Sequence, residues 1–371
     1  MRRVIHVGVC ICIFAIFLSD IGKSLNIEDA TFTLALGIDL DQEGRLKYYA
    51  ISPVFGREIK DKKETLYTTA DSTRESRGEF DKKSPGLTIG SKVQIILIGK
   101  NLLKHRNWFS LLDVFYRDFK GTVSPIVIAV DGPVSEIFHY TPDNKPLISI
   151  FLKKLITTAK LRGELVHTNL QELHRQIFEK GVTPYIPTLK KNNKLTLIGT
   201  SLLHNDGTFC INLNSQETVL LQILQGENAD YSFTFPVPTG QNSNITFKNR
   251  LSFSTQDVKT TIQTKYINKK FYFDIHITME LMMTEKLLSQ DMKNGHEKLE
   301  KIVKKQLKRN FETLIKKLQV ENLDPIGLGI HARAYQHTEY SHIKQPWEKK
   351  LSESKVCISV NVNINTMGGI K

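Results

Sequence analysis

Three segments in the second half of this 371-residue chain, 245–253, 271–281 and 356–364, alternate between apolar and polar residues. Alternation with a period of two buries one face of a strand and leaves the other wet, which is typical of antiparallel sheets. Between the second and third segments, apolar residues recur at helical spacing from about Leu287 to Leu318. The sequence therefore predicts that residues 244–371 form an antiparallel sheet packed against one long helix.

Residues 26–190 are predicted to form an α/β domain, because strand patterns alternate with helical ones. The expected strands are a hairpin over 30–52, with its turn at Asp39–Gly44, and two buried strands at 93–99 and 124–130. The expected helices lie over 103–119, from 133 onward, over 149–161, and from a capping box at Thr168 to Gly181. The segment 57–83 holds eight basic and seven acidic residues, so we expect a long exposed loop with one short helix at most.

A domain boundary is predicted near residues 184–194, where two prolines and a Lys/Asn-rich stretch interrupt the helical pattern. The following segment, 191–243, is predicted to be a small middle α/β domain. It contains a hairpin around Asn205-Asp206-Gly207 and a short helix over 216–225. The predicted fold class is α+β, with three mixed α/β domains at 26–190, 191–243 and 244–371.

The first 25 residues form a signal or membrane-anchor segment. Arg2 and Arg3 precede the run Val4–Leu18, which is apolar apart from His6 and Gly8. The run is long enough for a signal-peptide core but short for a full span of about 20 residues. The arginines favour a cytoplasmic start and an exported body. No A-x-A-like cleavage site follows, so retention and cleavage both stay open.

Composition narrows the class of protein. With 40% hydrophobic and 24% charged residues, the chain is neither disordered nor a multi-span membrane protein, and four cysteines are too few for a disulfide scaffold. Lys and Arg number 51 against 38 Asp and Glu, a net charge of +13 that favours an anionic partner. Because the body is expected outside the cytoplasm, nucleic acid is excluded, and a membrane surface or an acidic protein face is favoured.

No catalytic, cofactor-binding or metal-ligating residue is predicted. The segment Asp39–Gly44 resembles the start of a calcium loop, but Ala50 stands where that loop needs its glutamate, so a hairpin turn is favoured. Gly86–Lys92 lacks the spacing of a phosphate loop. Three histidines lie six and five residues apart, which matches no common zinc pattern and favours surface histidines: His331, His337 and His342.

Four ordered sets of motifs resemble the C-subunit family of bacterial spore germinant receptors. They span nearly the whole chain: Ile27–Ala30 with Leu36–Asp39, Val93–Gly99 with Leu112–Asp118, Gly199–Leu203 with Glu217-Thr218, and Asp324–Gly329 with Pro346-Trp347. The resemblance implies a three-domain, non-enzymatic protein on the outer face of the spore inner membrane. It would act in nutrient sensing with an integral-membrane A subunit and a transporter-like B subunit. The motifs name neither the nutrient nor the surface that meets these subunits.

Two other function classes stay open beside this hypothesis. One is an exported solute- or wall-binding protein that works alone, and the other is an exported hydrolase. Association with two integral membrane subunits would favour the receptor hypothesis, whereas a stable ligand-binding monomer would favour the first alternative.

The chain departs from the resembled family at its lipid-attachment site. Family members usually end the signal with Leu-Ser-Gly-Cys, whose cysteine becomes lipid-modified, whereas this chain reads Leu18-Ser19-Asp20-Ile21. No thioether lipid can form at Ile21, which occupies the family cysteine position. An uncleaved Val4–Leu18 helix would span roughly 22 Å, short of the ~30 Å hydrocarbon core, so local thinning would have to supply the difference. Reduced anchoring, release by cleavage and a degraded paralogue all stay open.

We expect membrane retention without a thioether-linked lipid, because the hydrophobic run is kept while the cysteine is not. Mass spectrometry of the mature amino terminus measures this. An intact end carrying Arg2 and Arg3 supports the uncleaved helix, and a lipid on Cys10 or Cys12 contradicts it.

Overall fold

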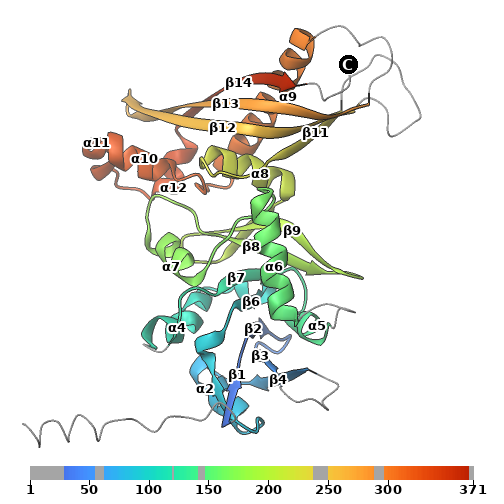
Figure 1. The fold of residues 1–371 in the computed structure, drawn as a ribbon. Coiled ribbons are helices and arrows are strands. Elements are labelled where there is room, and N and C mark those ends of the chain that lie inside the picture. The colour runs from blue at the N-terminus through green and yellow to red at the C-terminus, as the bar shows by residue number, and fades with distance from the viewer. Residues whose placement is uncertain are drawn as a thin grey trace, which may run out of the picture.

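The computed structural model describes residues 29–54, 62–118, 121–140, 147–236, 250–287 and 296–366. The predicted signal or anchor segment, 1–25, lies outside these ranges. Figure 1 shows a lower part built on an eight-stranded sheet and an upper part built on a four-stranded sheet. Within the described ranges, no helix has both the length and the apolar character needed to cross a bilayer.

The eight-stranded sheet has the order β10-β9-β8-β7-β6-β2-β3-β4. Four neighbouring strands in its middle, β2, β6, β7 and β8, run parallel. Every residue of β6 and β7 is buried, as parallel strands covered on both faces require. The strands are β2 (Ala35–Leu40), β3 (Leu46–Pro53), β4 (Lys63–Thr69), β6 (Ile95–Gly99), β7 (Ile126–Val130), β8 (Tyr185–Lys191), β9 (Leu195–Leu203) and β10 (Phe209–Leu213).

Helices cover both faces of this sheet, and alternate residues of its strands feed two separate cores. Ile96 and Ile98 pack in one core with α2 (Thr73–Asp81), α3 (Lys100–Leu103), η3 (Trp108–Leu112) and α7 (Leu170–Phe178). Ile95 and Leu97 pack in the other with α5 (Val134–His139) and α6 (Ile148–Leu161). A short parallel pair, β1 (Ala30–Phe32) with β5 (Leu87–Ile89), forms a separate sheet next to β3, and β5 leads into η2 (Gly90–Lys92).

The upper part packs one face of its sheet against helices. The strand order is β11 (Ser232–Pro236), β12 (Arg250–Ile267), β13 (Lys270–Leu287) and β14 (Lys355–Thr366). The apolar stripe of the long helix α9 (His296–Val320) and much of α8 (Ser215–Leu224) lie in the core under this sheet. Three shorter helices connect α9 to β14: α10 (Leu328–Tyr335), α11 (His337–Ser341) and α12 (Trp347–Ser352).

The mixed α+β class, the long helix, the alternating strands over 271–281 and 356–364, the two hairpins and the short helix near 216–225 are confirmed. Of the alternating segment 245–253, residues 250–253 lie in β12, and residues 245–249 lie outside the described ranges. The prediction of a purely antiparallel sheet is wrong for one strand, because β14 runs parallel to β13. The helices between them carry the chain back to the end where β13 began, and such a crossover makes the next strand parallel. Leu287, the predicted start of the long helix, is instead the last residue of strand β13, and the structure describes the helix from His296 onward.

The prediction of an exposed loop over 57–83 is wrong at residues 63–69, while the one short helix that it allowed is α2. Residues 63–69 form the edge strand β4, in which buried Leu66 and Thr68 alternate with exposed Tyr67 and Thr69. Its charged flank is a common way to keep an edge strand from pairing with another chain. The α2 helix then begins after Ser72, whose hydroxyl accepts a hydrogen bond from the Glu75 backbone N–H.

Two helix predictions need correction in detail. The helix over 103–119 is broken into α3, η3 and α4 (Asp113–Arg117), because Asn107 adopts a left-handed conformation with φ of +65°. The capping residue of α7 is Asn169 rather than Thr168. Asn169 Oδ1 accepts from the Glu172 backbone N–H at 2.8 Å, while the Thr168 hydroxyl donates to the Tyr185 carbonyl.

The sheet continues through the predicted boundary near residues 184–194. Strand β8 pairs with β9 along its whole length but with β7 only at Thr188 and Leu189, so Pro187 lies in the strand without breaking a full ladder. The predicted middle domain, 191–243, gives β9 and β10 to the lower sheet and α8 to the upper core. The division into domains at these limits stays a prediction.

Substituting Gly99→Ala is expected to destabilise the fold by about 2–3 kcal/mol. A Cβ there would lie 2.0 Å from Asp39 Oδ1, and the other oxygen of Asp39 accepts from the Val134 N–H at 2.9 Å. The matched control is Gly78→Ala in α2, where nothing lies within 4 Å, and it should stabilise the protein by about 0.5–1 kcal/mol. Denaturant unfolding of the full-length protein in detergent measures both, and equal stability of Gly99→Ala and wild type would contradict the prediction.

Candidate functional site

The lower and upper parts are joined where the segment between α7 and β8 meets the loop between α9 and α10. Thr183 and Asp324 are both fully or almost fully buried there. The Thr183 N–H donates to the Asp324 carbonyl at 2.8 Å, and the Asp324 N–H donates to Thr183 Oγ1 at 2.6 Å. These two hydrogen bonds connect residues 141 positions apart in the sequence.

The Asp324 carboxylate accepts four hydrogen bonds. The backbone N–H groups of Gly327 and Leu328 donate to Oδ1 at 2.9 and 3.0 Å, and that of Gly329 donates to Oδ2 at 2.7 Å. Trp347 Nε1 also donates to Oδ2, at 2.7 Å. The carboxylate therefore caps the start of α10 and holds the first residue of α12.

Burial raises the pKa of Asp324 to about 6, even though the hydrogen bonds from Trp347 and from the three backbone N–H groups lower it. All four partners are donors, so the arrangement fits the ionised carboxylate, which only accepts. The four partners thus offset part of the cost of burying this charge, and desolvation remains the larger effect on the pKa.

Trp347 extends this contact into the upper core. Its ring meets Phe271 edge-on, with centroids 5.4 Å apart at 74°, and lies 6.3 Å from Phe273 at 90°. Both phenylalanines belong to the buried face of β13. The indole therefore packs against the upper sheet while its N–H reaches the carboxylate.

Two glycines allow the two parts to touch through their backbones. A Cβ on Gly329 would lie 2.7 Å from the Gly181 Cα and 2.6 Å from Trp347 Nε1. At the rim, both guanidinium nitrogens of Arg333 donate to the Glu179 carboxylate at 2.8 Å, and this pairing lowers the pKa of Glu179. We call the following set the junction: Glu179, Gly181, Thr183, Asp324, Gly329, Arg333 and Trp347.

A polar cleft of about 480 Å³ opens beside the junction. Its lower wall includes His167, Arg175 and Tyr185, and its upper wall includes Gln222 and Gln225. Gln225 Nε2 donates a hydrogen bond to the Pro325 carbonyl at 2.7 Å. Burial raises the pKa of Tyr185 to about 12 and lowers that of His167, so both side chains are neutral at pH 7. The cleft offers hydrogen-bonding groups from both parts of the chain.

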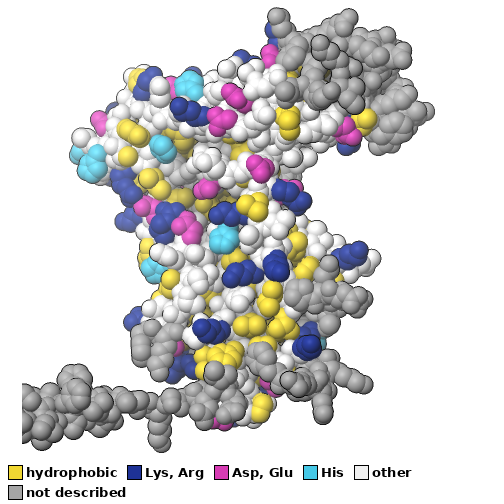
Figure 2. Space-filling model, in the orientation of Figure 1, with side chains coloured by type: hydrophobic (Ala, Val, Ile, Leu, Met, Phe, Trp, Pro, Cys, Tyr) yellow, Lys and Arg dark blue, Asp and Glu magenta, His cyan; other side chains and the backbone are white. Residues whose placement is uncertain are grey.

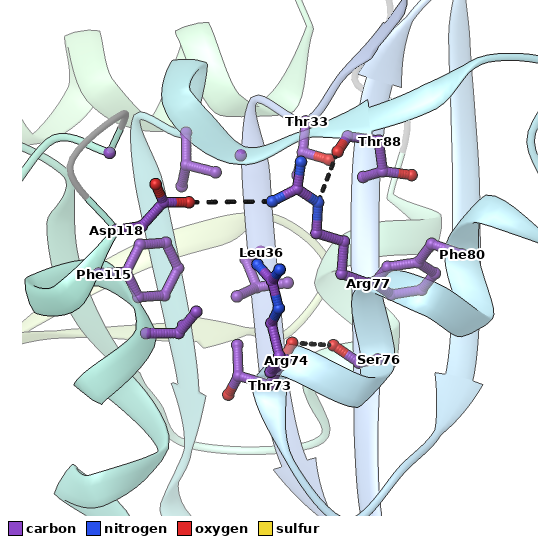
Figure 3. A pocket seen from close by; sticks show the side chains of 14 residues that line it. Thr33, Leu36, Thr73, Arg74, Ser76, Arg77, Phe80, Thr88, Phe115 and Asp118 are labelled. Atoms are coloured by element: carbon purple, nitrogen blue, oxygen red, sulfur yellow. Dashed lines mark hydrogen bonds and ion pairs between the residues drawn. The ribbon is translucent and has the colours of Figure 1, made fainter.

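Figure 3 shows an apolar pocket of about 70 Å³ enclosed by α2, β5 and α4. Phe80 and Phe115 line it, and Arg77 Nε donates to the Thr88 carbonyl at 2.8 Å across it. The Ser76 hydroxyl donates to the Thr73 carbonyl at 2.9 Å, as the dashed line in Figure 3 marks. The lining contains no histidine or cysteine, so it holds no serine–histidine arrangement for nucleophilic catalysis.

The residues singled out in the sequence lie apart from one another. Asp41 forms the predicted hairpin turn, where its Oδ1 accepts from the backbone N–H groups of Glu43 and Arg45 at 3.0 and 2.8 Å. His331 lies in α10 and His337 in α11. Among the residues that the structure describes, no group of three or more His, Cys, Asp and Glu side chains could hold a metal ion. The lipid-attachment position, Ile21, lies outside the described ranges.

The sequence singles out three of the seven junction residues. Asp324, Gly329 and Trp347 belong to motifs of the resembled family, and these motifs assign no role to any residue. Glu179 and Thr183 carry no signal in the sequence, because their partners come from distant elements. The sequence predicts Gly181 only as the end of a helix.

The structure is a mixed α+β fold in two parts. Comparison with known proteins shows the family to which the chain belongs. The domain model "Spore germination protein N-terminal domain" matches residues 23–191, and "Spore germination B3/ GerAC like, C-terminal" matches residues 198–368. The chain belongs to the spore germination family that these two domains define, which confirms the resemblance drawn from the motifs. The first model ends with the last residue of β8, and the second begins within β9.

Relatives match over nearly their full length. Spore germination protein GerQC of Bacillus cereus is 22% identical, with 96% of this chain and 97% of the relative covered. Spore germination protein B3 of Bacillus subtilis (strain 168) is 24% identical, with 93% of each covered. The crystal structure of the GerBC protein superposes with a TM-score of 0.59 at 19% identity, over 89% of this chain and 97% of that one, which shows a shared fold.

Substituting Asp324→Asn is expected to destabilise the fold by about 3–5 kcal/mol, because an amide NH₂ would face backbone donors and the indole would lose its charged acceptor. The matched control is Asp257→Asn, at an exposed position of β12. It should change the free energy of unfolding by less than about 0.5 kcal/mol. Denaturant unfolding at pH 7 measures both. A change of less than about 1 kcal/mol for Asp324→Asn would contradict the role given to this carboxylate.

The same pair of variants gives a pH prediction. The pKa of Asp324 is raised from 3.8 to about 6 in the folded protein, so the folded state binds the carboxyl proton of Asp324 more tightly than the unfolded state does. The protonated carboxyl therefore stabilises the folded state below pH 4, and this stabilisation of roughly 3 kcal/mol is lost as the pH rises through 6. This fall should be missing in Asp324→Asn and kept in Asp257→Asn when unfolding is measured from pH 4 to 7.

Proposed function

We propose that this chain is a non-enzymatic, membrane-tethered subunit of a spore nutrient germinant receptor. The observation that carries the proposal is the match of both family domains, in order, over 23–191 and 198–368. The printed names of the full-length relatives are those of spore germination proteins, which supports a role in the same process.

The junction supports a role in coupling rather than in chemistry. It joins the two family domains through the hydrogen bonds between Thr183 and Asp324, the Glu179–Arg333 ion pair and a close glycine contact. A force or contact applied to one domain is transmitted to the other, because packed groups with satisfied hydrogen bonds do not slide independently. A receptor subunit that relays a signal between partners needs this property.

The expected partners are integral-membrane A and B receptor subunits and the membrane surface, with the body on the outer face of the spore inner membrane. The net charge of +13 favours contact with anionic lipid head groups or an acidic partner face. In Figure 2, Lys and Arg side chains are spread over the visible face between acidic ones rather than gathered in one block. Tethering would come from the segment 1–25.

The alternative is an exported solute- or wall-binding protein that works alone. The polar cleft of about 480 Å³ is the observation that favours it, since its volume lies in the usual range for small-molecule sites. Co-purification separates the two functions: the receptor role requires two integral membrane proteins to accompany the chain, and the alternative requires a monomer.

Deleting the gene should impair germination with some nutrients and leave vegetative growth normal, because a receptor subunit acts only in the spore. The strain should lack other genes of this family, so that no paralogue compensates, and the wild-type gene returned in single copy is the control. Germination is followed by loss of optical density with each nutrient in turn. Unchanged germination with every nutrient would rule out the proposed function.

A further inference from the structure

Two large apolar side chains are exposed at the end of the lower part where the described chain begins. Tyr67 in β4 is 66% exposed, and Leu87 in β5 is 54% exposed. Pro85, two residues before Leu87, is exposed as well. Figure 1 shows β1, β4 and α2 at this lower end of the molecule and the four-stranded sheet at the opposite end. A single exposed apolar residue is ordinary, so these residues matter only if they lie together.

Contacts link these residues into one surface. Lys83 Nζ donates to the Tyr67 backbone carbonyl at 2.8 Å and lies 5.4 Å from the centre of the Tyr67 ring. The hydroxyl of the next residue, Ser84, lies 2.6 Å from that of Thr31 in β1 and shares a hydrogen bond with it. Strand β1 in turn pairs with β5, which carries Leu87. We call the following set the amino-terminal face: Tyr67, Lys83, Pro85 and Leu87.

The amino-terminal face lies beside the point where the chain enters the body. Ala30, the first residue of β1, is the strand partner of Leu87, and neighbouring strands are about 5 Å apart. Leu18, which ends the apolar run of the predicted anchor, is twelve residues before Ala30. A fully extended chain of that length reaches at most about 43 Å. An anchor in the bilayer therefore limits how far this face can move from the lipid, whereas the upper part can lie farther away.

The side chains of the amino-terminal face are of the kinds that enter a bilayer interface. Tyrosine is enriched at the head-group level, and lysine buries its stem while its ammonium stays in water. The nearby charges have no excess of either sign, because Lys82 and Lys83 stand beside Glu79 and Asp81. Lys82 Nζ lies 2.7 Å from the Glu79 carboxylate. Attraction to the bilayer therefore rests on the apolar side chains, and anionic lipid is not required.

We propose that the amino-terminal face rests on the lipid bilayer that holds segment 1–25, with Tyr67 and Leu87 at the level of the head groups. This inference rests on the proposed tether and adds an orientation to it. Strands β4 and β5 lie against the lipid. The junction, the polar cleft and the four-stranded sheet lie farther from it, where they can meet a solute or a partner subunit.

Quenching of tryptophan fluorescence by brominated lipid tests the contact, because bromine quenches only an indole that reaches the lipid. The full-length protein is reconstituted into phosphatidylcholine vesicles, with and without acyl chains brominated close to the head groups, and flotation first measures the tether. The two native tryptophans, Trp108 and Trp347, are buried and give a constant background. Leu87→Trp and Tyr67→Trp each place a reporter on the face. The matched control, Ile267→Trp, places one at the exposed end of β12 in the upper part.

Brominated vesicles should remove most of the emission added by Leu87→Trp and Tyr67→Trp and leave that of Ile267→Trp unchanged. A protein that floats with the vesicles while neither reporter on the face is quenched would overturn the contact and leave the tether standing. Equal quenching of Ile267→Trp would overturn the orientation. A protein that does not float with the vesicles would refute the tether, and the contact with it.

Discussion

The Asp324 carboxylate holds the start of α10 and the first residue of α12 in place. A buried charge is stable only where donors replace its water, and here three backbone N–H groups and one indole do so. Each donor belongs to an element that the carboxylate thereby positions. The backbone of the same residue accepts a hydrogen bond from the Thr183 N–H and donates one to the Thr183 hydroxyl, which fixes the lower part against the upper one.

The two parts of the chain bury their sheets in different ways. In the lower part, helices cover both faces of a largely parallel sheet, and alternate residues of one strand enter two cores. In the upper part, one face packs on α8 and α9 while the other meets water. The single-faced sheet exposes a broad polar surface, whereas the double-covered sheet exposes mainly its ends.

The proposed receptor role rests on the junction between the two domains rather than on a reactive group. Membership of the spore germination family places it in that process, and the junction gives a physical route between its two domains. Spread over the surface, the positive charge favours an acidic membrane or partner.

The sequence by itself determined the mixed α+β class, the long amphipathic helix, the alternating strands and the family, because periodic patterns and ordered motifs are local properties. It could not determine that β4 is an edge strand, that β14 is parallel to β13, or that β8 and β9 continue one sheet, since pairing is chosen by distant partners. The junction shows the same limit. Asp324 and Trp347 stood out as motif residues, but their hydrogen bond and the contact with Thr183 exist only once the tertiary fold brings them together and removes water from around them.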